Sequence, residues 1–336
     1  MTPGPTVDGA LVQWGERLFY PPNRIVKVPP TPRLDTLARR KAAVIRRRIE
    51  ATVLRRAPQV MVKVTGGGRG MRAIAAHFRY ISKGGRLDVE DDRGSVRRGR
   101  QAVDDLAEQW RHAGAKIDDE SPRREAFNLM LSMPQGTDAR IVKAAAREFA
   151  QTELRGHRYV MVLHEHQANP HVHLSVRAQA ADGRRLNPRK ADLHRWRETF
   201  ADKLRGYGVE AEATRQATRG AHHRARPIGR VKMREDGRLP GRDIAEPGGE
   251  RFYSSRRDAL EAWIHIAQAL GSSGTAEDRR LAHGVVGFLK DSKAFRRLLP
   301  RLEQLPDRQR EQARAPTRTP QQPELTRTRP DIDWER

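Results

Sequence analysis

The stretch YVMVLHEHQANPHVHLSV, residues 159–176, decides the fold expected for this chain. Its two ends, Tyr159–Leu163 and Leu174–Val176, are aliphatic, aromatic or β-branched, and this composition predicts two strands. Asn169 and Pro170 lie between them and are typical of a turn. Such a turn brings the end of the first strand beside the start of the second, so the stretch predicts a hairpin.

The same stretch carries three histidines whose spacing predicts a metal site. His171 and His173 are two residues apart on the second strand, so both side chains point to one face. His164 ends the first strand and joins them if the turn closes the hairpin. Three converging neutral imidazoles bind a divalent metal and leave coordination positions open for a substrate. The alternative is that each histidine is an ordinary packed or solvated side chain, and the third histidine at hairpin spacing favours the metal site.

The charge of the chain indicates the class of partner. Its 336 residues include 66 Lys and Arg against 42 Asp and Glu, which gives a net charge of +24. This excess favours a polyanion, with nucleic acid first and an anionic membrane surface second. No membrane insertion is expected, because no apolar stretch approaches the ~20 residues of a spanning helix.

The redox and targeting signals fit a cytoplasmic protein. The absence of cysteine excludes disulfides and thiolate metal sites. The first ten residues, MTPGPTVDGA, lack the basic-then-apolar order of a secretory signal. We therefore expect a cytoplasmic location.

Helical and strand patterns alternate along the middle of the chain. Glycine or capping signals bound the amphipathic segments, and the strands are short and aliphatic. This order predicts an α+β fold with a largely antiparallel sheet covered by helices, followed by a small helical C-terminal region. Residues 65–70, TGGGRG, are expected to form a flexible loop that lacks the Gly-Lys-Ser/Thr ending of a nucleotide-binding loop. The other elements expected are strands at 60–64, 126–133 and 209–213 and helices at 71–82, 101–114, 139–153 and 190–208.

Composition divides the chain into five predicted regions. They are a basic Pro/Arg-rich N-terminal extension (1–58), a compact domain (59–220), a basic linker (221–250), a small helical region (251–305) and a disordered polar tail (306–336). An Arg-dense helix in the extension has sparse apolar positions: Leu37, Val44, Ile49 and Val53. It fits a phosphate-contacting arm and a solvated basic helix equally well.

Several motifs together resemble a known family. HEHQANPHVHL (164–174) is similar to the histidine motif of conjugative relaxases, the mobilization nucleases of the MobA and Vir-D type in the HUH endonuclease superfamily. AHFRYISKGG (76–85) resembles the tyrosine motif of that family, with Tyr80 in the nucleophile position. AFNLMLSMPQGT and the segment that begins LNPRKADLHRW also agree, so the resemblance extends from about Val60 to Gly220.

The resemblance implies a site- and strand-specific DNA nickase. Tyr80 would attack the scissile phosphate at an origin of transfer and form a 5′-phosphotyrosyl link, and the freed 3′-hydroxyl would later reseal the strand. His164, His171 and His173 would hold Mg²⁺ or Mn²⁺. The implied partners are origin DNA, accessory relaxosome proteins and the coupling protein of a type IV secretion system. The covalent complex would then be translocated into a recipient cell.

One position departs from the family pattern. Many relatives carry Asp two residues after the first histidine, where this chain has His166. A carboxylate there orients a ligand histidine or helps to deprotonate the tyrosine. Either Glu165 is turned toward the site by an irregular strand end, or His166 takes a different role. Glu165 and His166 are both candidate catalytic residues on this basis.

Basic residues around the motifs are candidate DNA contacts, although a single surface cation is more often only solvated. The six candidates are Arg79, Lys83, Arg177, Arg185, Arg189 and Lys190.

Two alternative functions stay open. A rolling-circle replication initiator or a transposase of the same superfamily would place its tyrosine after the histidines, whereas Tyr80 precedes them. A non-catalytic DNA-binding accessory protein is favoured only by His166 in place of the acid.

Overall fold

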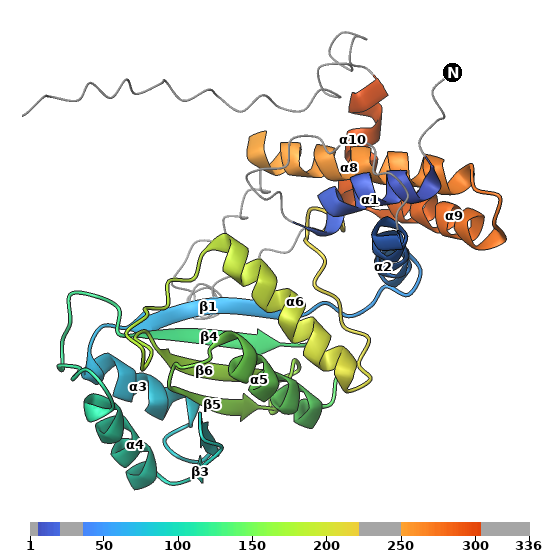
Figure 1. The fold of residues 1–336 in the computed structure, drawn as a ribbon. Coiled ribbons are helices and arrows are strands. Elements are labelled where there is room, and N and C mark those ends of the chain that lie inside the picture. Colours follow the sequence, from blue (N-terminus) through green and yellow to red (C-terminus); the bar gives the residue numbers. More distant parts are fainter. Residues whose placement is uncertain (1–5, 21–35, 222–249, 304–336) are drawn as a thin grey trace, which may run out of the picture.

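The computed structural model describes residues 6–20, 36–221 and 250–303, which form a sheet-containing part and a helical cluster (Figure 1). The sheet has six strands in the order β1-β4-β6-β5-β2-β3, and every neighbouring pair is antiparallel. The expected α+β class with an antiparallel sheet is therefore confirmed. The strands are β1 (Met61–Gly68), β2 (Val89–Asp91), β3 (Val96–Arg97), β4 (Ala126–Ser132), β5 (Tyr159–His164) and β6 (His171–Arg177).

Two helices, α5 (Ala139–Glu153) and α6 (Lys190–Gly206), cover one face of the sheet (Figure 1). Asp138 caps the start of α5, where its side chain accepts a hydrogen bond from the Arg140 amide. The expected amphipathic pattern of α6 is confirmed at three positions four residues apart, which are fully buried: Trp196, Phe200 and Leu204. These side chains belong to one hydrophobic cluster with alternate residues of β5 and β6, so the hairpin presents its other side chains to the opposite face.

The opposite face is covered by α3 (Met71–Ile81) and α4 (Arg100–His112). Four apolar residues at spacings of three and four form the buried stripe of α3: Met71, Ile74, Phe78 and Ile81. Val160 and Val162 of β5 belong to the same hydrophobic cluster. The face of the hairpin that carries the even-numbered residues of β5 therefore lies under α3.

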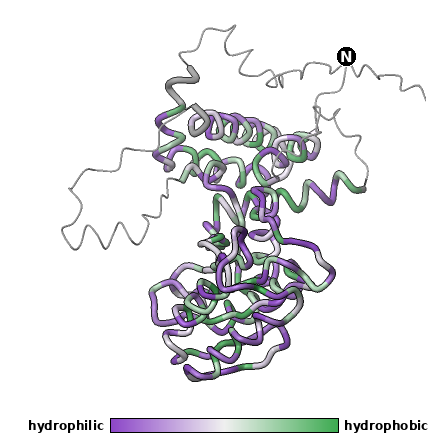
Figure 2. Tube along the Cα trace, turned by 90° about the vertical axis from the view of Figure 1, so that its left-hand side faces the viewer, coloured by the Kyte–Doolittle hydropathy of each residue, from purple (hydrophilic) through white to green (hydrophobic). Residues whose placement is uncertain are grey.

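The helical cluster combines the two ends of the chain. Its core includes residues from α1 and α2 together with residues from the three C-terminal helices. In Figure 2 hydrophobic and hydrophilic residues follow one another along these helices, as in other amphipathic helices. The helices are α1 (Val7–Phe19), α2 (Thr36–Val53), α8 (Glu250–Gly271), α9 (Ala276–Asp291) and α10 (Lys293–Glu303).

The segment after α6 joins the cluster to the sheet-containing part. The Thr218 hydroxyl donates a hydrogen bond of 2.7 Å to the Leu18 carbonyl, and the Trp263 indole donates one of 2.8 Å to the Thr218 carbonyl. From α2, Arg48 forms an ion pair with Glu198 of α6 at 2.7 Å. These contacts hold both chain ends against the sheet-containing part.

The expected loop at residues 65–70 is wrong for its first four residues, because β1 continues through Thr65 to Gly68 with an irregularity after Val64. The glycines allow this by letting two backbones approach closely. A Cβ on Gly67 would lie 2.3 Å from the Ala126 carbonyl oxygen of β4. The glycine run is therefore part of the sheet.

Two further expectations differ from the structure. Residues 209–213 form only an isolated parallel bridge between Glu212 and Gln59 and no strand. The Arg-dense helix is neither an arm nor simply solvated, because α2 buries Ala42, Ile45 and Ile49 in the helical cluster. Of the four apolar positions noted above, Ile49 and Val53 are on this buried face, whereas Leu37 and Val44 are exposed.

The expected linker and tail fall on residues 222–249 and 304–336, outside the described residues. The division at residues 58 and 220 stays a prediction. None of the helices in the described ranges has both the length and the apolar character of a membrane span.

Candidate metal centre and nucleophile

The β5–β6 hairpin brings the three histidines together. His164, the last residue of β5, pairs directly with His171, the first residue of β6. His173 follows two residues later on the same face of β6. All three imidazoles therefore lie on the side of the sheet that α3 covers.

The imidazoles are close enough to share one ion. Their ring centroids are 5.1 Å apart for His164 and His171, 4.7 Å for His164 and His173, and 5.0 Å for His171 and His173. One ring nitrogen from each lies within 4.8 Å of the other two. His164 and His171 are buried and His173 is partly buried.

Backbone carbonyls orient two of the rings. The Nε2 atom of His164 donates to the Ile81 carbonyl at 2.6 Å, and the Nδ1 atom of His171 donates to the Asn169 carbonyl at 2.9 Å. Because a carbonyl only accepts, each ring keeps its other nitrogen as a lone-pair donor. The turn between the two strands thus supplies the Asn169 carbonyl, which orients the ring of the candidate ligand His171.

The surroundings of two of these histidines, His164 and His173, favour the neutral form. Burial, together with the neighbouring His164 and His171, lowers the pKa of His173 to about 3. Burial also lowers the pKa of His164, against the opposing effect of the hydrogen bond with the Ile81 carbonyl. A neutral imidazole is the form that binds a metal.

The donor set fits a divalent cation. The Nδ1 atom of His173 is buried and has no hydrogen-bond partner in the described part of the chain. An unpaired buried nitrogen is costly unless something binds or protonates it, and burial opposes protonation here. Three nitrogen ligands suit several transition metals, so the geometry does not select one ion.

Tyr80 precedes the residue whose carbonyl contacts this group. The carbonyl that accepts from His164 belongs to Ile81, the next residue, so the end of α3 is tied to the histidines. The Tyr80 side chain is 72% exposed, and it is therefore open to a large substrate.

Two other tyrosines are less suited to nucleophilic attack. Tyr159 is buried, which raises its pKa to about 12. The Tyr207 hydroxyl donates to Glu148, and this hydrogen bond raises the Tyr207 pKa.

Glu165 and His166 lie just beyond the end of β5, so strand alternation does not fix their directions. Both are exposed. The His166 ring lies 5.2 Å from the His164 ring, on the side of the three histidines. Of the two candidates, His166 is therefore the one whose ring lies close to the three-histidine group.

His77 is a residue near the site that the sequence patterns did not assign. It lies one turn before Tyr80 on α3, and the two rings are stacked with centroids 6.3 Å apart. Its Nε2 atom is buried without a hydrogen-bond partner among the described residues, and burial lowers its pKa to about 4. The sequence signal that could have identified His77 is its i, i+3 spacing from Tyr80, because residues at this spacing are neighbours on a helix surface.

The candidate DNA contacts have different surroundings. Arg177 is buried and donates to the carbonyls of Trp110, Ala113 and Ala115 at the end of α4. Arg79 pairs with Asp104, and Arg185 donates to the Arg124 carbonyl. Lys83 lies two residues after α3 with φ of 52°. Arg189 and Lys190 are exposed at the start of α6.

Comparison with known proteins identifies the family of this region. Residues 80–209 match the model of the relaxase family described as MobA/VirD2-like, nuclease domain. The chain carries a MobA/VirD2-like relaxase nuclease domain. The matched residues begin at Tyr80 and include all three histidines, a narrower range than the resemblance from Val60 to Gly220.

A curated relative of the relaxase domain is the T-DNA border endonuclease VirD2 of Rhizobium radiobacter. It is 24% identical over 207 residues, which cover 55% of this chain and 48% of that protein. The chain thus spans about half the length of this relative.

Proposed function

We propose that the relaxase domain nicks one strand of DNA and remains covalently attached to it. The observation that carries this proposal is the hydrogen bond from His164 to the Ile81 carbonyl, which ties the three-histidine group to the helix end that bears Tyr80. The family match and the net charge of +24 support DNA as the substrate.

In the proposed step, the Tyr80 hydroxyl oxygen attacks the scissile phosphorus. The phosphorus–oxygen bond to the 3′ side breaks, the tyrosine proton is lost, and the leaving 3′ oxygen takes up a proton. The product is a 5′-phosphotyrosyl link and a free 3′-hydroxyl, which reseals the strand by the reverse attack.

Each neighbouring group has a role in this proposal. His164, His171 and His173 would hold Mg²⁺ or Mn²⁺, which would supply Lewis-acid polarisation of the phosphate. Glu165 and His166, exposed beside the histidines, are the candidates that accept the tyrosine proton. Arg79, Lys83, Arg189 and Lys190 are the candidates that bind the DNA backbone near the site.

The biological setting proposed is conjugative mobilization. The DNA would be an origin of transfer on a plasmid or integrative element, in a bacterial cytoplasm. Accessory relaxosome proteins and a type IV secretion coupling protein would be the partners, and the protein would be translocated with the strand. These proposals rest on the family match alone.

A covalent-capture assay tests the nicking step. Supercoiled plasmid with a candidate origin is incubated with the protein and Mn²⁺ or EDTA, stopped in detergent, and divided into samples with and without protease treatment. We expect a metal-dependent nicked circle, and a protein–DNA adduct that maps to Tyr80 in the sample without protease. Tyr80→Phe should abolish the adduct and leave DNA affinity nearly unchanged, while Tyr207→Phe should behave as the unmodified chain.

A second candidate function is DNA binding without cleavage. His166, which stands where many relatives have an acid, favours it. Binding without nicking, on single-stranded substrate as well, would contradict the nuclease proposal and support this alternative.

A further inference from the structure

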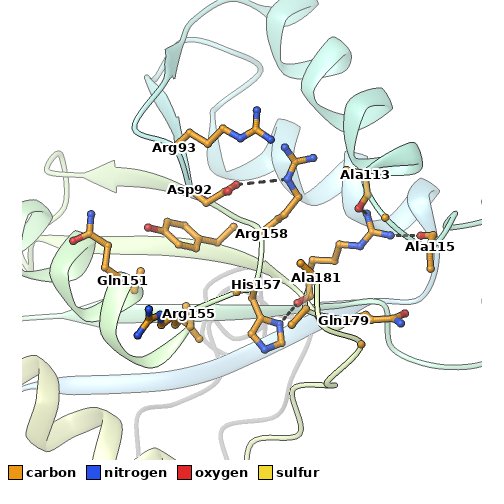
Figure 3. A pocket seen from close by; sticks show the side chains of 18 residues that line it. Asp92, Arg93, Ala113, Ala115, Gln151, Arg155, His157, Arg158, Gln179 and Ala181 are labelled. Atoms are coloured by element: carbon orange, nitrogen blue, oxygen red, sulfur yellow. Dashed lines mark hydrogen bonds and ion pairs between the residues drawn. The ribbon is translucent and has the colours of Figure 1, made fainter.

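A cavity of about 680 Å³ lies at the end of the β5–β6 hairpin away from the histidines (Figure 3). Tyr159, the first residue of β5, lines it, whereas His164 ends the same strand. At ~3.4 Å per residue this places the cavity about 17 Å from the histidine group. The volume is typical of small-molecule sites, which enclose about 300–1,000 Å³.

Four segments meet around this cavity. They are the turn after β2, the end of α4, the end of α5 with the loop into β5, and the loop after β6. None of them carries Tyr80 or a histidine of the three-histidine group. The cavity is therefore a separate feature of the domain.

Cations dominate its lining. Four arginines line the cavity, Arg93, Arg155, Arg158 and Arg177, against one carboxylate, that of Asp92. These four guanidinium groups and the one carboxylate carry a net charge of +3. A cavity with such a lining attracts an anion.

Two of the arginines have structural partners. Arg177 donates to three carbonyls at the end of α4, so its guanidinium is occupied. The Nε atom of Arg158 lies 3.9 Å from the Asp92 carboxylate.

The other two arginines have no such partner. Within residues 6–20, 36–221 and 250–303, no hydrogen bond or ion pair involves the Arg93 or Arg155 guanidinium. Arg93 follows β2 and is not at a helix end. Arg155 follows α5, where a cation favours the helix end, but it donates to none of the helix carbonyls. In Figure 3 Arg93 lies toward the top of the view and Arg155 toward the bottom.

Neutral polar groups complete the lining. The Nδ1 atom of His157 donates to the Arg177 carbonyl at 2.9 Å, which leaves Nε2 as an acceptor. Gln151 and Gln179 also line the cavity, and an amide both donates and accepts. These groups match the edge of a heterocyclic base, while guanidinium groups match a phosphate in bidentate geometry.

We propose that this cavity is a second binding site of the domain, which takes a nucleotide unit and holds its phosphate with the guanidinium of Arg93 or with that of Arg155. The unit is supplied by a DNA strand or by a free nucleotide, which share this chemistry. The site goes beyond the proposed nicking function, since it needs neither Tyr80 nor the histidines.

Binding of two probes to the full chain in EDTA tests the proposal. The probes are a labelled short single-stranded oligonucleotide and a labelled deoxynucleoside monophosphate, followed by fluorescence anisotropy. The test variant is R93Q/R155Q. The control R280Q/K290Q removes the same charge from exposed positions on α9. We expect the test variant to lose about tenfold more affinity than the control for at least one probe.

The two probes distinguish the source of the nucleotide. A selective loss for the monophosphate indicates a free nucleotide, and a selective loss for the oligonucleotide alone indicates a DNA strand. Equal losses in the two variants, or no loss for either probe, would overturn the proposal, since attraction to the net charge alone would then explain binding.

Two further measurements secure this result. Thermal unfolding of both variants shows that they remain folded. Bromodeoxyuridine in the oligonucleotide, when irradiated, should crosslink to residues 150–159 if the DNA strand fills the cavity. Because EDTA is present, failure of strand cleavage does not affect either readout, and failure of the cavity does not affect the Tyr80 adduct.

Discussion

His164 makes two connections that matter at the scale of single residues. Its ring belongs to the three-histidine group, and its Nε2 atom donates to the carbonyl next to Tyr80. One side chain therefore links the candidate metal ligands to the helix end that carries the candidate nucleophile. A change at His164 would disturb both, so a ligand role is better tested at His171.

Loss of a residue that only supports a metal ligand weakens metal binding about 10–100-fold. We expect His171→Ala, which removes a ligand itself, to weaken Mn²⁺ binding by more than this. Isothermal titration calorimetry measures this on the protein without DNA. His112→Ala is the matched control, because His112 is an exposed histidine on α4. Equal affinity in the two variants would exclude His171 as a ligand.

His77 should make the protein less stable in mild acid. Its pKa is about 4 in the folded chain, below the ordinary 6.5, because it is buried. Between these values the unfolded chain binds more protons, so stability falls as pH decreases from about 6.5 toward 4. We expect His77→Leu to reduce this dependence. Melting temperatures of both proteins from pH 7 to pH 4 check it, and parallel curves would contradict it.

At the scale of elements, an ion pair joins the edge of the sheet to α5. Glu90 of β2 is 2% exposed and accepts hydrogen bonds from Arg147 and Lys143. Burial opposes its ionisation, but the two cations outweigh this effect and hold the Glu90 pKa below its usual value. The strand is only three residues long, so this pairing is a large part of what holds it.

We expect Glu90→Gln to lower the free energy of unfolding by about 2–3 kcal/mol at pH 7. The stabilisation is present above the unfolded pKa of Glu90 and is lost as pH falls through the lowered folded value. Urea unfolding at pH 7 and at pH 3 should therefore show the difference shrinking in acid. The control Glu108→Gln changes an exposed carboxylate and should cost less than about 1 kcal/mol.

Sequence patterns predicted the elements whose signals are local. The β5–β6 hairpin and the gathering of its histidines follow from alternation and an Asn-Pro turn. Helices α3 and α6 follow from apolar stripes. These signals need only neighbouring residues.

The other elements depend on distant partners. The β2–β3 hairpin contains Glu90, which reads as a surface residue until its two cations on α5 are known. The glycines of β1 predict a loop from the local sequence, because their pairing with β4 has no local signal. The cavity at Arg93 and Arg155 needs four segments in place. Such features have no periodic signal in the sequence.

At the scale of the whole molecule, the two chain ends share one core. Trp263 of α8 is fully buried, contacts Phe19 of α1 edge to face at 6.1 Å, and donates to the Thr218 carbonyl. It therefore links the N-terminal helices, the C-terminal helices and the segment after α6.

We expect Trp263→Ala to destabilise the helical cluster by about 3–5 kcal/mol. Hydrogen exchange should then accelerate in α1 as well as in α8, although more than 200 residues separate them in sequence. Trp263→Phe keeps most of the volume and should cost less. Faster exchange confined to α8–α10 would contradict a shared core.

The shared core also has a consequence for synthesis. Helix α1 begins at Val7 and its partner α8 begins at Glu250. At ~5–20 residues per second, ribosomes need about 10–50 s to deliver that partner. During this interval the sheet can form, while the apolar residues of α1 and α2 that pack against α8–α10 stay exposed to solvent. The nascent chain thus spends most of its translation with its first helices dependent on chaperones or on transient contacts.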